Sequence, residues 1–207
     1  GAVTTSGAQA YNGPATLGAD TVLTGPQVTF GSTLDSGSST HRALTISGNG
    51  TFNGAIGATN ALDSLLVTGN ALLNSGVTSL AVDKTLTVDG TTGINTTGVI
   101  AAATQTYKGA VTLGANATLS GNATFNSTIN GTTAGAQSLT VQGTAGNATF
   151  GGAVGAGTAL AALTVGGTAS NNGASVTTTG VQTYKGAVNL GGPATALSGS
   201  AVDFQGT

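Results

Sequence analysis

One ten-residue segment occurs three times in this chain, with a tyrosine at the third position of each copy. The copies are Gln9–Gly18, Gln105–Gly114 and Gln182–Gly191. An internal repeat constrains the fold strongly, because repeated units that cannot bury their apolar faces alone must stack on one another. The sequence therefore predicts a stack of similar units.

The spacing of the three tyrosines indicates the size of one unit. The interval from Tyr107 to Tyr184 is shorter than the interval from Tyr11 to Tyr107, and the difference equals the distance in sequence from Tyr11 to Phe30. Phe125 follows Tyr107 at nearly the same distance. We infer a unit of ~19 residues, with one extra unit in the first interval near positions 77–94, because a whole coil can be added to a solenoid without disturbing its neighbours.

Short apolar–Thr–apolar stretches predict the strands. Alternation with a period of two places the apolar pair on one face and threonine on the other, as in a half-buried strand. Asn-Gly and Ser-Gly pairs between these stretches favour tight corners. The predicted strands are Ala15–Leu17, Val22–Leu23, Val28–Phe30, Leu44–Ile46, Leu65–Val67, Leu80–Val82, Leu86–Val88, Val111–Leu113, Leu139–Val141, Leu163–Val165 and Val188–Leu190.

These features together predict an all-β fold, a right-handed parallel β-helix with three short strands per coil and a roughly triangular section. Residues 1–207 form a single solenoid segment of about 11 coils at ~19 residues each. The coils group into modules of four to five, beginning at Gln9, Gln105 and Gln182. The chain opens late in one module and closes early in another, so we expect a window of a longer array.

The composition excludes several classes of protein. Only 5% of the 207 residues are charged, against about a quarter in an ordinary domain. There are 36 Gly and 39 Thr, no Cys and no Glu, and the net charge is −2. Without a basic surface we expect no nucleic-acid partner, and without a long apolar run we expect no membrane span in this segment. A hydrophobic fraction of 39% favours an ordered β structure over disorder.

The period of ~19 residues, the Gly-Ala-Val-Thr-Leu-Gly and Leu-Thr-Val-x-Gly motifs and the abundance of Thr, Gly, Asn and Ala resemble a known group. They are similar to the repeat shafts of filamentous haemagglutinin-like adhesins, which leave the cell by two-partner secretion or as autotransporters. The resemblance covers essentially the whole chain. It implies an extracellular fibre on the bacterial surface that attaches cells to surfaces or to one another. The secretion-recognition domain of such proteins is absent from this sequence.

The aromatic residues of the repeats are the landmarks of the sequence. We expect them to fill the core or cover a corner, because copies separated by about 4 to 5 coils, roughly 20 to 24 Å, cannot form one sugar-binding platform. The landmarks are Tyr11, Tyr107, Tyr184, Phe30, Phe125 and Phe204.

The titratable residues are too sparse for most active sites, and we expect no catalysis, no cofactor and no metal. A metal site would require His41, the only histidine, to meet Asp35 and Asp63. A catalytic triad of Ser38 or Ser39 with His41 and Asp35 is disfavoured, because sequence neighbours rarely provide that geometry. The remaining carboxylates, at Asp20, Asp83, Asp89 and Asp203, are isolated in the sequence and favour corner positions.

Asn-x-Thr sequons, the acceptor motif for N-glycosylation, occur seven times. In a chain this rich in Asn and Thr they arise by composition, and asparagine is also expected at β-helix corners. The sequons begin at Asn49, Asn95, Asn116, Asn122, Asn126, Asn130 and Asn147.

These features bear on four functions. The first is a structural stalk of a secreted adhesin, whose partners are its own neighbouring coils and a host or neighbouring-cell surface. The alternative is a subunit of an extracellular filament that stacks head to tail through uncapped ends. An ice-binding face is disfavoured because the position of Thr16 and Thr112 becomes Asn189 in the third copy. A polysaccharide lyase or glycosidase would require a cleft of clustered charges.

Overall fold

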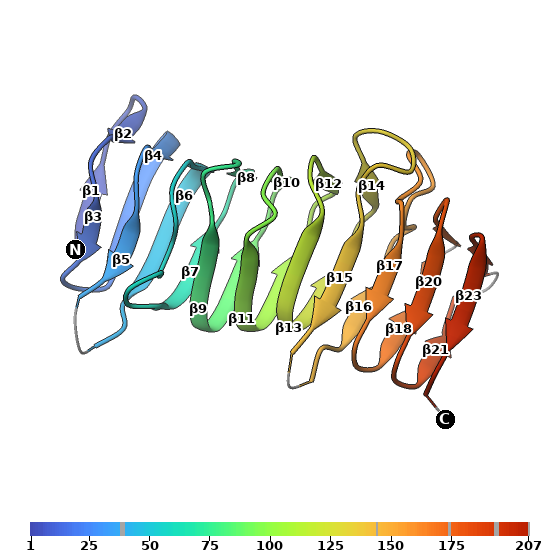
Figure 1. Ribbon diagram of the computed structural model, residues 1–207. Helices are drawn as coiled ribbons and strands as arrows, with labels where there is room; N and C mark the ends of the chain where they lie inside the picture. Colours follow the sequence, from blue (N-terminus) through green and yellow to red (C-terminus); the bar gives the residue numbers. More distant parts are fainter. Residues whose placement is uncertain (38–39, 144, 174, 193–194, 207) are drawn as a thin grey trace.

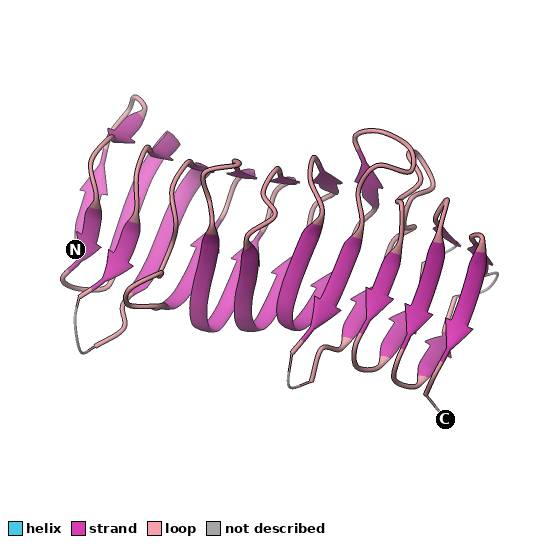
Figure 2. Ribbon diagram, viewed as in Figure 1, coloured by secondary structure: helices cyan, strands magenta, loops and turns pink. Residues whose placement is uncertain are grey.

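The structure is a rod of stacked coils with the two ends of the chain at opposite ends (Figure 1). This computed structural model describes residues 1–37, 40–143, 145–173, 175–192 and 195–206. Within these ranges there is no helix, and every strand pairing is parallel (Figure 2). The rod contains about 10 turns, and equivalent positions on successive turns are about 20 residues apart in the sequence. The predicted all-β parallel solenoid is therefore confirmed.

Three ladders of strands run along the rod, and the chain visits them in the order I, II, III in each turn. Ladder I contains β2 (Gln9–Tyr11), the later parts of β4 (Thr21–Phe30) and β6 (Ala43–Phe52), β8 (Ala71–Leu73), β10 (Thr92–Ile94), β12 (Val111–Leu113), β14 (Ile129–Gly131), β19 (Ser175–Thr177) and β22 (Ala196–Ser198). Val154 bridges β14 and β19.

The other two ladders share three long strands, whereas β4 and β6 contribute to ladders III and I. Ladder II contains β3 (Ala15–Leu17), β5 (Leu34–Ser36), the first parts of β9 (Ser79–Val88), β11 (Val99–Tyr107) and β13 (Ala117–Phe125), then β15 (Leu139–Gln142), β17 (Leu163–Val165), β20 (Val181–Tyr184) and β23 (Ala201–Phe204). Ladder III contains β1 (Ala2–Thr4), the first parts of β4 and β6, β7 (Leu62–Val67), the later parts of β9, β11 and β13, then β16 (Ala148–Phe150), β18 (Ala169–Asn171) and β21 (Val188–Leu190).

The core is a column of apolar side chains that point inward from all three ladders. Along ladder III, Ile46, Val67 and Val88 stand on successive turns and are at most 2% exposed. The residues between them point outward, because successive side chains of a strand face opposite sides. Burial of each such side chain stabilises the fold by about 1.5–3 kcal/mol. Every turn thus contributes to one continuous core.

The length of a turn varies because the corners absorb insertions. Tyr11, Phe30 and Phe52 occupy paired positions on successive turns of ladder I, and the step from Phe30 to Phe52 is longer than the step from Tyr11 to Phe30. The bend within β11 contains one more residue than the bend within β13, so the register shifts there. The unit length inferred from the sequence is therefore the length of some turns rather than of all.

Glycine is required where two corners touch. Gly121 has φ of +112°, and a Cβ atom built on it would lie 1.8 Å from the carbonyl oxygen of Ala102 in the turn before. A Cβ atom built on Gly48 would likewise lie 1.8 Å from the carbonyl oxygen of Gly25 in the turn before. No other residue type has room for a side chain at these positions or favours that backbone conformation.

We expect removal of one whole turn to preserve the fold and removal of half a turn to destroy it. Leu73 and Ile94 occupy equivalent positions on successive turns, so deletion of residues 74–94 keeps every later turn in register. The shortened chain should keep its β circular dichroism and unfold in one cooperative transition.

The control is deletion of residues 74–84, which puts each following strand on the wrong ladder. We expect that variant to lose its cooperative transition. Equal behaviour of the two deletions would contradict the independence of the turns.

Candidate functional site

A buried glutamine and a tyrosine form the same clamp in each copy of the repeated segment, which we call the Gln–Tyr clamp. In the central copy, Gln105 is 1% exposed and Tyr107 is completely buried. The Gln105 Nε2 atom donates to the carbonyl oxygens of Ile100 at 3.0 Å and of Ser120 at 3.1 Å. The Tyr107 hydroxyl donates to Gln105 Oε1 at 2.8 Å. Because Ser120 belongs to the following turn, the amide joins two turns.

The other two copies repeat this geometry. Nε2 of Gln9 donates to the Thr24 carbonyl oxygen at 2.8 Å, and Nε2 of Gln182 donates to that of Ser198 at 2.8 Å. The hydroxyls of Tyr11 and Tyr184 donate to their glutamines at 2.9 and 3.1 Å. A buried amide without partners would destabilise the fold, and each clamp supplies those partners at a corner where the regular ladder is interrupted.

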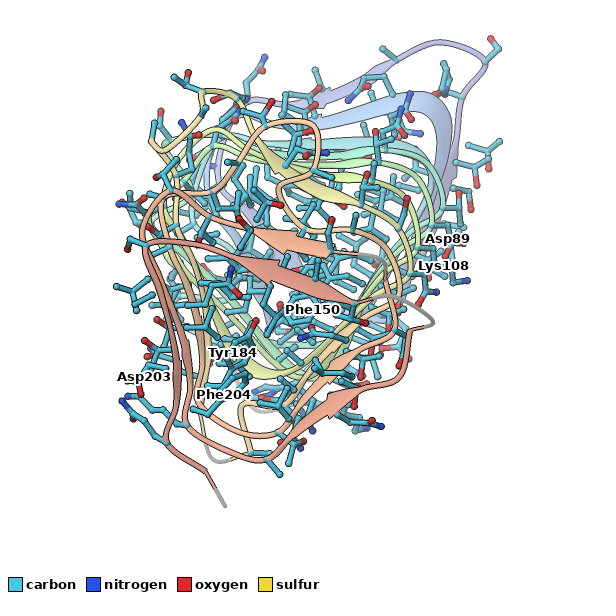
Figure 3. The ribbon with its side chains drawn as sticks, turned by 90° about the vertical axis from the view of Figure 1, so that its right-hand side faces the viewer. Asp89, Lys108, Phe150, Tyr184, Asp203 and Phe204 are labelled. Carbon is cyan, nitrogen blue, oxygen red and sulfur yellow. The ribbon has the colours of Figure 1, made fainter. Side chains whose placement is uncertain are left out.

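Each tyrosine stacks on the phenylalanine ring of the next turn, and Phe30 and Phe125 belong to the core whereas Phe204, on the last turn, is exposed. The rings of Tyr107 and Phe125 are 5.2 Å apart and nearly parallel, and Phe150 follows at 5.6 Å. Tyr11 and Phe30 are also 5.2 Å apart. Figure 3 shows the last such pair, Tyr184 beside Phe204, whose ring centroids are 5.4 Å apart. The parallel register places equivalent side chains directly over one another, and this contact explains the tyrosine-to-phenylalanine spacing of one turn.

The three clamps lie on three different ladders. Tyr11 lies on ladder I, and the residue at the equivalent position four turns later is Ile94. From Ile94 the chain passes through ladder II before it reaches Tyr107 on ladder III. Tyr184 lies on ladder II, paired with Val165. The repeat therefore advances along the rod by four and two-thirds turns from Tyr11 to Tyr107, and by three and two-thirds turns from Tyr107 to Tyr184.

This rotation corrects one inference from the sequence. Thr16, Thr112 and Asn189 occupy equivalent positions of the repeat but lie on ladders II, I and III. A comparison between them therefore carries no information about a flat threonine face. The longest columns of stacked outward threonines are Thr87, Thr106, Thr124 and Thr149 on ladder III and Thr118, Thr140, Thr164 and Thr183 on ladder II.

Burial has a clear electrostatic effect on the clamp. It raises the pKa of the Tyr107 hydroxyl well above its ordinary value, because the buried phenolate would lose its hydration. The pKa of Tyr184 is raised for the same reason. These hydroxyls remain protonated at neutral pH and donate to the Oε1 atoms of Gln105 and Gln182.

The three residues considered for a metal site, His41, Asp35 and Asp63, each bind a different partner and not one another. His41 pairs through Nδ1 with Asp83, Asp63 pairs with Lys84 at 2.7 Å, and Asp35 Oδ1 accepts the backbone N–H of Thr59 at 2.9 Å. Within the described ranges there is no group of three or more His, Cys, Asp or Glu side chains. Ser38 and Ser39 lie outside the described residues.

All four carboxylates that are isolated in the sequence have partners in the structure, and Asp203 Oδ2 accepts a hydrogen bond from Gln205 Nε2 at 2.7 Å. Asp83 pairs with His41, and Asp89 forms an ion pair with Lys108 at 2.8 Å across adjacent turns. Asp20 accepts the backbone N–H of Ala43 at 3.0 Å. Figure 3 shows Asp89 and Lys108 together at one edge of the section and Asp203 at the other. The Asp20 and Asp89 contacts join neighbouring turns, whereas His41 and Asp83 lie two turns apart.

Comparison with known proteins gives no relative. No protein-family model matches the chain, and no curated protein or solved structure matches it. In the part of the chain that the structure describes, no helix is long and apolar enough to cross a membrane.

We expect the Gln–Tyr clamp to stabilise the rod measurably. Tyr107→Phe leaves Gln105 Oε1 buried without its donor, which should lower the free energy of unfolding by about 1–3 kcal/mol. Tyr11→Phe is the matched control, because Tyr11 is only partly buried and water can replace the lost partner. Chemical denaturation monitored by circular dichroism measures both.

The double variant Gln105→Leu/Tyr107→Phe tests the coupling. It should lose less stability than the sum of the two single variants, because neither orphaned group remains. Strict additivity would contradict the clamp as a unit.

Proposed function

We propose that this chain is a structural segment of the stalk of a secreted bacterial surface adhesin, which spaces a binding region from the cell and takes no part in catalysis. The observation that carries the proposal is the continuous stack of about 10 turns in one register. At about 4.8 Å per turn, such a stack is a rod of roughly 50 Å.

The interior of the rod supports a mechanical role. The repeated motif, which is the part of the sequence with the strongest internal similarity, lies in the core at Gln105, Tyr107, Gln182 and Tyr184, where no external ligand reaches it. The resemblance to haemagglutinin-like shafts points in the same direction and supplies the expectation of an extracellular location, attachment between cells and biofilm formation.

We expect an unrelated rod to substitute for this chain. In the full protein, deletion of the segment should reduce the attachment of cells, and replacement by an unrelated β-solenoid of ten turns should restore it. Antibodies to the folded segment should label intact cells that make the protein. Attachment is measured by counting cells retained on a surface under flow.

Failure of the replacement rod to restore attachment, with equal amounts of protein on the surface, would assign the binding to this segment and overturn the spacer proposal. Absence of label on intact cells would overturn the surface location. An equal-length flexible linker is the control for rigidity, and we expect it to restore little.

Head-to-tail assembly of separate copies is the second candidate. It is favoured by apolar side chains exposed on the terminal turns, with Val3 43% exposed at one end and Leu190 48% and Phe204 52% exposed at the other. Assembly by such ends should give rods whose mass rises with concentration in sedimentation, and Phe204→Asp should abolish the increase. A monomer at all concentrations would contradict this candidate.

A further inference from the structure

Six of the seven sequon asparagines use their side-chain amide to connect turns. Five accept a backbone N–H from the next turn through Oδ1, and Asn95 Nδ2 donates to Asn74 Oδ1 at 3.4 Å. The five accepted bonds are Asn70 to Asn49 at 2.9 Å, Ser138 to Asn116 at 2.9 Å, Asn147 to Asn122 at 3.3 Å, Gly157 to Asn130 at 2.9 Å and Thr168 to Asn147 at 2.8 Å.

Asn126 differs from these six residues. Its side chain is exposed and forms no hydrogen bond with the described part of the chain, whereas its backbone N–H is held by the Tyr107 carbonyl oxygen at 2.9 Å. The register places it opposite Gly151 on the next turn, because Phe125 pairs with Phe150. Glycine has no side chain there, and a Cβ atom at Gly151 would lie 3.3 Å from the Cα atom of Asn126, so the two backbones are in close contact and no side chain of the next turn covers Asn126 at this position.

The neighbour on the preceding turn is engaged elsewhere. The register places Lys108 opposite Asn126, and the Lys108 ammonium group is bound to Asp89 at 2.8 Å. The third sequon residue, Thr128, lies in the same short corner between β13 and β14 and is partly exposed. The carboxamide of Asn126 and the hydroxyl-bearing residue that follows it are thus presented together on the outside of the rod.

From this difference we propose that Asn126 is a site of N-linked glycosylation. Nδ2 attacks the anomeric carbon of a nucleotide-activated hexose, and a carbon–nitrogen bond forms as the bond from that carbon to the diphosphate breaks. The nucleoside diphosphate leaves, and the proton from Nδ2 passes to the enzyme that catalyses the transfer. The sugar then projects from a corner of the rod.

The capping asparagines are poor acceptors for a physical reason. The transferring enzyme must take the carboxamide into its own active site, which withdraws Oδ1 from the backbone N–H of the next turn. That N–H then loses its partner at a corner where the regular ladder offers no other. Asn126 can be withdrawn without breaking any hydrogen bond of its side chain.

The test is glycosylation of the folded chain by a soluble asparagine glycosyltransferase with UDP-glucose as donor. We expect one hexose per chain by intact mass, mapped to Asn126 by peptide sequencing. Asn126→Gln and Thr128→Ala should lose the hexose, and Thr128→Ser should keep it. Asn116→Gln is the matched control, because Asn116 is exposed but its Oδ1 caps Ser138, and this variant should be modified as fully as the unchanged chain.

A peptide covering residues 120–132 shows that the enzyme is active, and circular dichroism shows that each variant is folded. Modification of the peptide but not of the folded chain would overturn the proposal, as would a hexose on Asn116 or another capping asparagine. The protein isolated from the cells that make it supplies the second readout. A peptide containing Asn126 found wholly without sugar there would overturn natural modification at this site.

Discussion

The parallel register between successive turns is the constraint on which the rest of the structure depends. Most turns supply strands of only a few residues to each ladder, and such strands are stable only when paired on both sides. Backbone hydrogen bonds between turns, such as Lys108 N–H to the Val88 carbonyl oxygen at 2.9 Å, satisfy polar groups that a short isolated strand would leave to water. Once one turn is in place, its edge determines where the next must lie.

The same register decides what the core contains. Side chains in equivalent positions lie over one another, so Tyr107, Phe125 and Phe150 stack at spacings set by the backbone. A column of uniform apolar residues would tolerate a slip of one turn, because every rung would look alike. We infer that the buried Gln–Tyr clamps oppose such slips. The Gln105 amide reaches two carbonyl oxygens only at the bend of β11, where Ile100 of its own turn and Ser120 of the next turn lie close to it.

Sequence reasoning reached the fold class and many of the strands. The eleven predicted strands all fall within observed strands, because an apolar–Thr–apolar pattern such as Leu139–Val141 indicates a half-buried strand by itself. Strands made of small or polar residues were missed, including β10 (Thr92–Ile94) and β18 (Ala169–Asn171). Their extended conformation is imposed by pairing with the turns on either side, which no local pattern reports.

The sequence alone determined that the chain repeats, that its unit is close to one turn, and that tyrosine and phenylalanine recur one unit apart. Only the tertiary structure decided which residues stack. The repeated segment advances by a whole number of turns plus two thirds, so its copies at Tyr11, Tyr107 and Tyr184 lie on three different ladders. The physical reason is that a strand recognises the edge of the preceding turn through its backbone, which is the same on all three ladders.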